Sequence, residues 1–295
     1  MRLGSLHEPK RHQNGQCKSS RQETGESRTA GGDVMNPYQL PDTEWASRML
    51  FRTEVGSTAH GTGVDGMEDY DEIGVISEPI MSLVGLHQEQ QTVVYRPGRT
   101  DTERSGPGDW DLTVYTARKW CRLTADGNPS LLVSLFGPRV QTTENGLALL
   151  GNPQWFWSQK ARPRFLGYAK AQRERLLGIR GGAHTNRPEL VAEHGYDTKY
   201  AMHMLRLGYQ GIEFMLTGKI ALPMEDGRGD HLRAVRRGEV SKDDVVGAAL
   251  GLEHQLKHLS SDAPDEPDYR AIDGWLLSLN GLNRNGRALK EATDG

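Results

Sequence analysis

The stretch GSTAHGTGVDGMEDYDEIGV, residues 56–75, combines a glycine-rich turn, two aspartates and an apolar run. The preceding residues 50–55, LFRTEV, alternate in polarity and predict a strand that runs directly into Gly56 and Ser57. The residues from Tyr70 onward, YDEIGVISE, predict a second strand. The stretch is therefore either a solvated glycine loop with scattered charge, or a site that holds phosphate and metal along a few residues of backbone.

The turn and the two aspartates each suit phosphate chemistry. A glycine at a strand-to-helix turn lets phosphate approach backbone N–H groups, and the Ser57 hydroxyl can donate to a phosphate oxygen. Asp69 and Asp71 are two residues apart, so in a strand both carboxylates point to one face. Such carboxylates repel each other unless a cation lies between them, and Mg²⁺ prefers carboxylate and phosphate oxygens. Either motif alone is usually an ordinary turn or solvated charge; their order behind a strand favours a site.

Composition limits the compartments, partners and cysteine-based sites that are expected for this chain. The chain has 295 residues, 36% of them hydrophobic, with a formal net charge of -3, which excludes neither nucleotides nor nucleic acid as partners. No apolar run reaches the roughly 18 residues of a membrane span, and the N-terminal residues lack the apolar core of a secretory signal. Cys17 and Cys121 are the two cysteines, so we expect neither a disulfide framework nor a cysteine zinc site. A reducing, cytoplasmic location is expected.

The chain divides into three parts by pattern. Residues 1–34 are rich in Gly, Ser, Gln, Arg and Glu and predict a disordered tail. Residues 35–148 carry the strand signals and predict a small mixed-sheet core, whereas residues 149–295 predict a mainly helical domain. The fold class expected is therefore α+β. Further strands are expected at 92–97 and from 109, and helices at 42–50, 117–126, 128–138, 197–218, 241–261 and 269–281.

Residues 56–75 resemble the G-S…D-x-D signature of the DNA polymerase β-like nucleotidyltransferase superfamily, in particular the bacterial and phage proteins typified by GSxAYGxxxxxSDxDxxGV. Two further blocks are similar to that family: DLTVYTARKWCRLTADGNPSLLVSLF at 111–136 and GYDTKYAMHMLRLGYQGIEFMLTGKIALP at 195–223. The resemblance covers roughly residues 45–240. The first motif is specific to the superfamily, and the other two narrow the subfamily.

The resemblance implies a metal-dependent transfer of NMP from an NTP to a hydroxyl acceptor, with release of pyrophosphate. It implies two Mg²⁺ ions, or Mn²⁺ in their place, held by Asp69, Asp71 and a third carboxylate on a neighbouring strand. Asp111 best matches that third position; Asp109, two residues earlier, is the reserve candidate. Gly56 and Ser57 would then hold the departing phosphates.

One spacing and two residues depart from the family pattern. The spacing from Ser57 to Asp69 is one residue longer, which a loop can absorb. Val133 stands where relatives carry a Glu after Asn-Pro, so any catalytic role of that Glu is empty or displaced here. His60 replaces an aromatic residue and is expected to be a loop side chain near the nucleotide.

Lys199, His203 and Arg206 lie at i, i+4 and i+7 of one predicted helix and therefore share a face. The resemblance makes them candidates for binding the nucleotide triphosphate or a polymer phosphate; the alternative is a solvated basic helix face. Tyr115, Lys119 and Asn128 are further candidate site residues. For Tyr115, a place in the core is an equally good interpretation.

A second basic segment covers residues 160–180, where aromatic Phe165 and Tyr168 are interleaved with cations. Such a segment can hold single-stranded RNA by phosphate pairing and stacking, and a solvated helix is the alternative. Its seven cationic residues are Lys160, Arg162, Arg164, Lys170, Arg173, Arg175 and Arg180.

The leading hypothesis is a nucleotidyltransferase with an NTP substrate and an RNA acceptor, either a tRNA end or RNA under repair. One alternative is a non-catalytic nucleotide- or RNA-binding module that retains the fold. Another is a phosphohydrolase, although that class usually adds closely spaced His ligands, which do not stand beside this motif. The sequence leaves the acceptor, the base transferred and the oligomeric state open, and no membrane partner is expected.

Overall fold

The structure, a computed structural model, describes residues 40–63, 69–86, 88–100, 105–106, 108–179, 187–224 and 226–282. The tail predicted at 1–34 lies outside these residues. In chain order the elements are α1 (Glu44–Ser47), β1 (Met49–Glu54), α2 (Ser57–His60), β2 (Tyr70–Ile76), α3 (Ile80–Val84), β3 (Thr92–Tyr95), β4 (Trp110–Thr116), α4 (Ala117–Ala125), α5 (Pro129–Ser134), β5 (Arg139–Thr142), α6 (Glu144–Leu150), η1 (Pro153–Phe156), α7 (Ala161–Leu176), α8 (Pro188–His194), α9 (Thr198–Thr217), α10 (Arg228–Arg236), α11 (Lys242–His258) and α12 (Tyr269–Ser278).

The described strands form one five-stranded sheet in the order β3-β4-β2-β1-β5. β1 is antiparallel to β2 and to β5, β3 is antiparallel to β4, and β2 and β4 run parallel. This mixed sheet, accompanied by many helices, confirms the expected α+β class. β5 was not predicted, because an edge strand of four residues carries too little alternation to be recognised.

The two faces of the sheet have different surroundings. Along β4, Trp110, Leu112 and Val114 alternate into a cluster that also contains Met49 and Ile76. The intervening residues of β4 point to the other face, where β2 supplies buried apolar residues to the main core. The period of two along a strand therefore places the aspartates of β2 and β4 on the helix-covered face.

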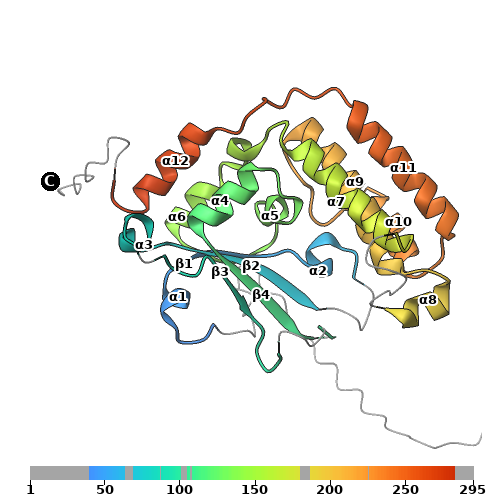
Figure 1. The fold of residues 1–295 in the computed structure, drawn as a ribbon, viewed down its shortest axis with the longest axis horizontal. Helices are drawn as coiled ribbons and strands as arrows, with labels where there is room; N and C mark the ends of the chain where they lie inside the picture. The colour runs from blue at the N-terminus through green and yellow to red at the C-terminus, as the bar shows by residue number, and fades with distance from the viewer. Residues whose placement is uncertain are drawn as a thin grey trace, which may run out of the picture. The chain divides into compact units, whose positions relative to one another are not determined.

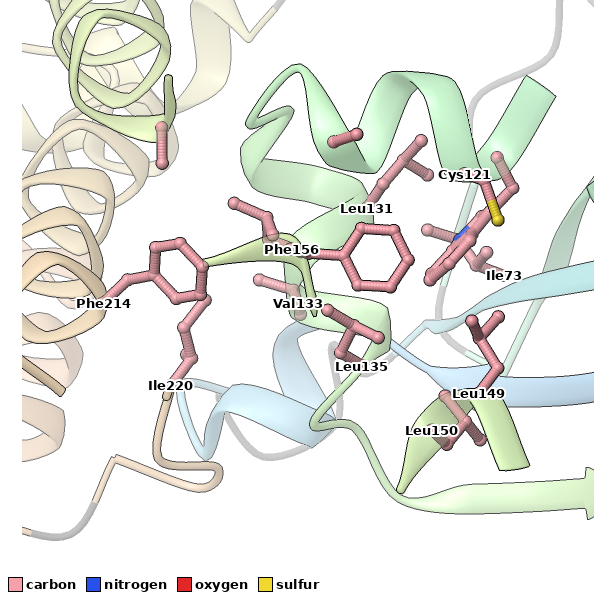
Figure 2. Close-up of a cluster of buried hydrophobic side chains, with 14 of the residues drawn as sticks. Ile73, Cys121, Leu131, Val133, Leu135, Leu149, Leu150, Phe156, Phe214 and Ile220 are labelled. Atoms are coloured by element: carbon pink, nitrogen blue, oxygen red, sulfur yellow. The ribbon is translucent and has the colours of Figure 1, made fainter. Parts of the chain in front are cut away.

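The main core joins the sheet to the helices that follow it. The Trp120 ring of α4 meets Phe51 of β1 at 5.5 Å and Phe156 of η1 at 5.4 Å, both edge to face. Figure 2 shows Phe156 and Phe214 within this same cluster of buried side chains. The boundary predicted between residues 148 and 149 stays a prediction, since two structural parts can share a core.

Helix α9 is the central helix of the helical part predicted at residues 149–295, where it packs against α7, α10 and α11 (Figure 1). It begins where the Asp197 carboxylate accepts from the backbone N–H groups of Lys199 and Tyr200, and it ends at Gly218 in the left-handed conformation. The sequence predicts this helix with almost the same bounds. No described helix combines the length and apolarity needed to cross a bilayer.

The helix caps agree with the local sequence pattern in two places and differ from it in a third. Asn128 caps α5 by accepting from Ser130 N–H, and Ser241 caps α11 by accepting from Asp244 N–H, as predicted. For the first helix the predicted cap, Asp42, is wrong: α1 begins one residue later than that cap requires, after Thr43.

Candidate active site

Two of the predicted carboxylates are neighbours across adjacent strands. β2 and β4 pair in register, with Asp71 directly beside Asp111. Side chains at paired positions of parallel strands point to the same face, so both carboxylates lie on the helix-covered side. Asp69 immediately precedes β2, and the N–H of Tyr70 extends the pairing by donating to the carbonyl of Asp109 at 2.8 Å.

Asp71 is a buried carboxyl group that feels the charges of both other predicted carboxylates. Its pKa is raised to about 6, first by burial and then by the negative charges of Asp69 and Asp111. The positive charges of Lys199 and Arg206 act in the opposite direction. The other two predicted metal ligands and two of the predicted cations therefore all act electrostatically on Asp71.

Gly56 lies directly against the Asp71 side chain. A Cβ atom at this position would come within 2.9 Å of the Asp71 Oδ2 atom and 3.0 Å of its Cβ. The backbone fixes the same contact, since Val55 N–H donates to the Asp71 carbonyl at 2.8 Å. Gly56 caps α2, whose first residue is Ser57, so the turn and the carboxylate are held side by side.

The predicted cationic face of α9 approaches this site. Lys199 Nζ lies 3.9 Å from Asp69 Oδ2. Burial lowers the pKa of the Arg206 guanidinium to about 10, against the charge of Asp71. Burial, followed by the positive charges of Arg206 and Lys199, lowers the pKa of His203 well below its usual value, so His203 is neutral near pH 7. Whether these residues bind nucleotide stays a prediction.

A cavity of about 280 Å³ opens between the carboxylates, α2, α5 and α9. His60 is a buried residue of α2 rather than the loop side chain expected, and Val133 supplies an apolar patch where relatives have Glu. The amide nitrogen of buried Gln210 donates to Nδ1 of His60 at 3.1 Å, in keeping with the lowered pKa of that imidazole. The polar and charged side chains that line the cavity include His60, Arg96, Asp71, Asp111, Arg206 and Gln210.

Two arginines that the sequence reasoning missed contact Asp111. Arg96 Nε lies 3.3 Å from Asp111 Oδ1, and Arg99 and the Ser105 hydroxyl donate to the same carboxylate. Asp109 instead pairs with Arg99 at 3.3 Å. Residues 96–99, Arg-Pro-Gly-Arg, are a recognisable turn after a strand, but no local signal says that the turn folds back onto β4.

Two further missed cations, Arg187 and Arg236, lie near the α9 face. Both add to the positive field that lowers the pKa of His203. Arg236 Nη1 donates to the Thr198 hydroxyl at 3.1 Å, and Arg187 lies over the Tyr200 ring at 5.3 Å. The positive field around the start of α9 is therefore larger than the sequence indicates.

The carboxylates fit a divalent cation by chemistry but are not arranged around one. No three His, Cys, Asp or Glu side chains in the described part of the chain are gathered to hold a metal ion. Asp111 is engaged by Arg96, Arg99 and Ser105 instead. Hard oxygen donors suit Mg²⁺, and a cation would stabilise the Asp71 charge, whose pKa is raised first by burial and then by like charge. Asp111 would have to exchange arginine for the cation.

The basic segment of α7 is largely paired within the protein. Arg173 contacts Glu253 at 2.9 Å, and Arg162 donates to the carbonyls of Leu256 and Leu259. Lys160, Arg164 and Lys170 also have acidic partners. These contacts favour a structural role over the RNA-binding interpretation for this helix. Arg180 lies outside the described residues.

The likeness of this chain to known proteins lies at the level of the family. No curated protein matches the chain. Among solved structures, a nucleotidyltransferase-like protein from Exiguobacterium sibiricum is similar, with 13% identity and a TM-score of 0.27 over 71% of this chain and 69% of that chain. Residues 35–278 match the family described as the RNA repair pathway DNA polymerase beta family. The chain therefore belongs to that family and is a polymerase β-like nucleotidyltransferase.

Proposed function

We propose that this protein moves NMP from an NTP to a hydroxyl group of RNA and releases pyrophosphate, with Mg²⁺ or Mn²⁺ as cofactor. The observation that carries the proposal is the register of β2 and β4, which sets Asp71 beside Asp111 while Gly56 holds the α2 turn against Asp71. The choice of RNA as acceptor is supported by the family description, which names an RNA repair pathway.

Each side chain has a role in this scheme. Asp69, Asp71 and Asp111 would hold the divalent cations, which neutralise the triphosphate and make the attacking hydroxyl more acidic. The N-terminal turn of α2, at Gly56 and Ser57, binds the departing phosphates. The acceptor oxygen forms a bond to the α-phosphorus, the bond from that phosphorus to the pyrophosphate oxygen breaks, and the hydroxyl proton leaves to water.

The α9 face complements this arrangement. Lys199, beside Asp69, and Arg206, beside Asp71, offer positive charge to the phosphates as the NTP enters. His203 is held neutral and so offers a hydrogen bond rather than a charge. The three predicted α9 residues thus divide into two cationic contacts and one neutral one.

The test uses radiolabelled NTPs, each in turn, with an RNA pool, Mg²⁺ and the full chain. The wild type should label RNA, and the double variant Asp69→Asn with Asp71→Asn should reduce labelling to background. Asp243→Asn, on the exposed surface of α11, is the matched control and should label as the wild type does. Unchanged transfer by the double variant would contradict the assignment of Asp69 and Asp71 to the catalytic site.

A non-catalytic nucleotide-binding module is the second candidate, and one observation favours it. Asp111 is paired with Arg96 and Arg99, so the third carboxylate is engaged by the protein itself. Calorimetry with NTP separates the two candidates. Binding that needs Mg²⁺ supports the enzyme, whereas binding of equal strength with Mg²⁺ and with a chelator supports the module.

A further inference from the structure

The two arginines that contact Asp111 have different surroundings. Arg99 also reaches the Ser105 hydroxyl at 3.1 Å, the Trp110 carbonyl at 3.3 Å and Asp109 at 3.3 Å. Its side chain is 11% exposed, so it fastens the loop before β4 to the strand. Arg96 is 30% exposed, and it lines the cavity together with Asp71 and Asp111. Arg96 is therefore the guanidinium that a substrate can reach.

The strand order places the α2 turn and Arg96 on opposite sides of β2. Gly56 and Ser57 follow β1, and Arg96 follows β3, which lies beyond β4 on the other side of β2. An in-line displacement places the attacking and the leaving oxygen on opposite sides of the phosphorus. With the departing phosphates at the α2 turn, the attacking hydroxyl comes from the β4–β3 side, where Arg96 lies.

Charge decides what Arg96 contacts during the reaction. A cation held by Asp111 would take the carboxylate oxygens that Arg96 now faces and would repel its guanidinium. Arg96 would then seek another anion on the acceptor side. A nucleic-acid acceptor presents one there, namely the phosphodiester that precedes its terminal hydroxyl, and guanidinium binds phosphate through paired hydrogen bonds.

We propose that Arg96 binds the terminal phosphodiester of the acceptor and so selects a nucleic-acid strand over a protein hydroxyl or a small alcohol. The inference rests on the proposed function, because it takes the direction of attack from it. In the metal-free protein Asp111 holds Arg96, and a cation bound at Asp111 would release Arg96 to the acceptor phosphate.

The first test measures binding alone, by fluorescence anisotropy of a labelled RNA oligonucleotide with Mg²⁺ and without NTP. One oligonucleotide has a natural terminal phosphodiester, and its match has an uncharged methylphosphonate at that linkage. The wild type should bind the charged strand about tenfold more tightly, and Arg96→Gln should remove the difference. Arg96→Lys should keep part of this difference in affinity, since lysine keeps the positive charge but cannot form the paired hydrogen bonds of a guanidinium. Arg118→Gln, which removes an exposed arginine paired with Glu78 beyond the other end of β4, is the control.

Transfer kinetics supply the second test. Arg96→Gln should raise the acceptor KM about tenfold for the charged strand and leave the NTP KM unchanged. Equal losses on both strands, or a wild type that binds both strands equally, would overturn the proposal, as would a preference for protein or alcohol acceptors. A wild type without transfer activity would count against the proposed function alone, because the anisotropy result is read independently of turnover. Thermal unfolding of each variant shows whether it is folded.

Discussion

The carboxyl group of Asp71 sets the pH behaviour of the site at the residue scale. Its pKa in the folded chain is about 6, above the ordinary value of 3.8, because burial and two neighbouring carboxylates disfavour the charge. The ionised form therefore costs folding free energy above pH 6, and the cost disappears below about pH 4, where Asp71 is protonated both folded and unfolded.

Replacement of this carboxylate should stabilise the metal-free protein. We expect Asp71→Asn to raise the free energy of unfolding at pH 7.5 by on the order of 2 kcal/mol, and the gain should vanish below about pH 4. The measurement is thermal or urea unfolding across pH in a chelating buffer, with Asp243→Asn as the exposed control. A gain that grows as the pH falls would show that burial and like charge do not raise the pKa of Asp71.

Gly56 gives a second prediction at the same scale. A methyl group there would contact the Asp71 carboxylate at 2.9 Å, so Gly56→Ala should displace the carboxylate. Transfer should fall about a hundredfold, because a displacement of about 1 Å in a catalytic group has that effect. Gly247→Ala on α11, where an added Cβ atom would meet no other part of the protein within 4 Å, is the control and should keep full activity. If Gly56→Ala transferred normally, the close approach would be unnecessary.

At the element scale, α9 shows what the local pattern predicts and what it does not. Its bounds follow from an apolar stripe with Asp197 and Gly218 at the ends, and the shared face of its cations follows from helical spacing. The meeting of that face with Asp69 is a tertiary property. It depends on how closely neighbouring helices approach α9, and no pattern within the helix encodes that distance.

Gly211 is one of the residues that set this approach. A Cβ atom there would lie 2.7 Å from Leu256 of α11 and 2.9 Å from Phe165 of α7. We expect Gly211→Val to destabilise the protein by about 1–3 kcal/mol through overpacking, measured by urea unfolding. The same change at open Gly247 should have a much smaller effect, and equal effects at both positions would show that helix propensity, and not packing, is responsible.

At the scale of the whole molecule, the predictions from sequence succeed where the signal is local. The expected strands β1, β2, β3 and β4 and the α+β class are present, because alternation and turns mark them. The motif resemblance alone selects Asp69, Asp71 and Asp111 as candidates, and the sheet register places Asp71 beside Asp111. The sequence does not predict the roles of Arg96 and Arg99, because their contact with Asp111 depends on a loop that returns to the sheet. It does not predict β5 because that strand is short.

The aromatic core leads to the last prediction, which concerns cooperativity. Phe156 is fully buried and touches Trp120, and the ring of Phe214 in α9 lies 6.3 Å from Phe165 in α7 and 6.5 Å from Phe136. Because one cluster contains rings from the sheet half and from the helical half, loss of either half exposes the other. Residues 40–282 should therefore unfold in a single transition.

Tryptophan fluorescence and far-UV circular dichroism, recorded on the same urea series, should give coincident midpoints. Phe156→Ala should lower both midpoints together and cost about 3–5 kcal/mol, since a buried aromatic ring is lost and a cavity remains. Leu250→Ala, whose side chain is 48% exposed on α11, is the control for loss of an apolar group. Two separated transitions, with Phe156→Ala shifting only one, would instead support the boundary predicted at residues 148–149 as a division between independently folding domains.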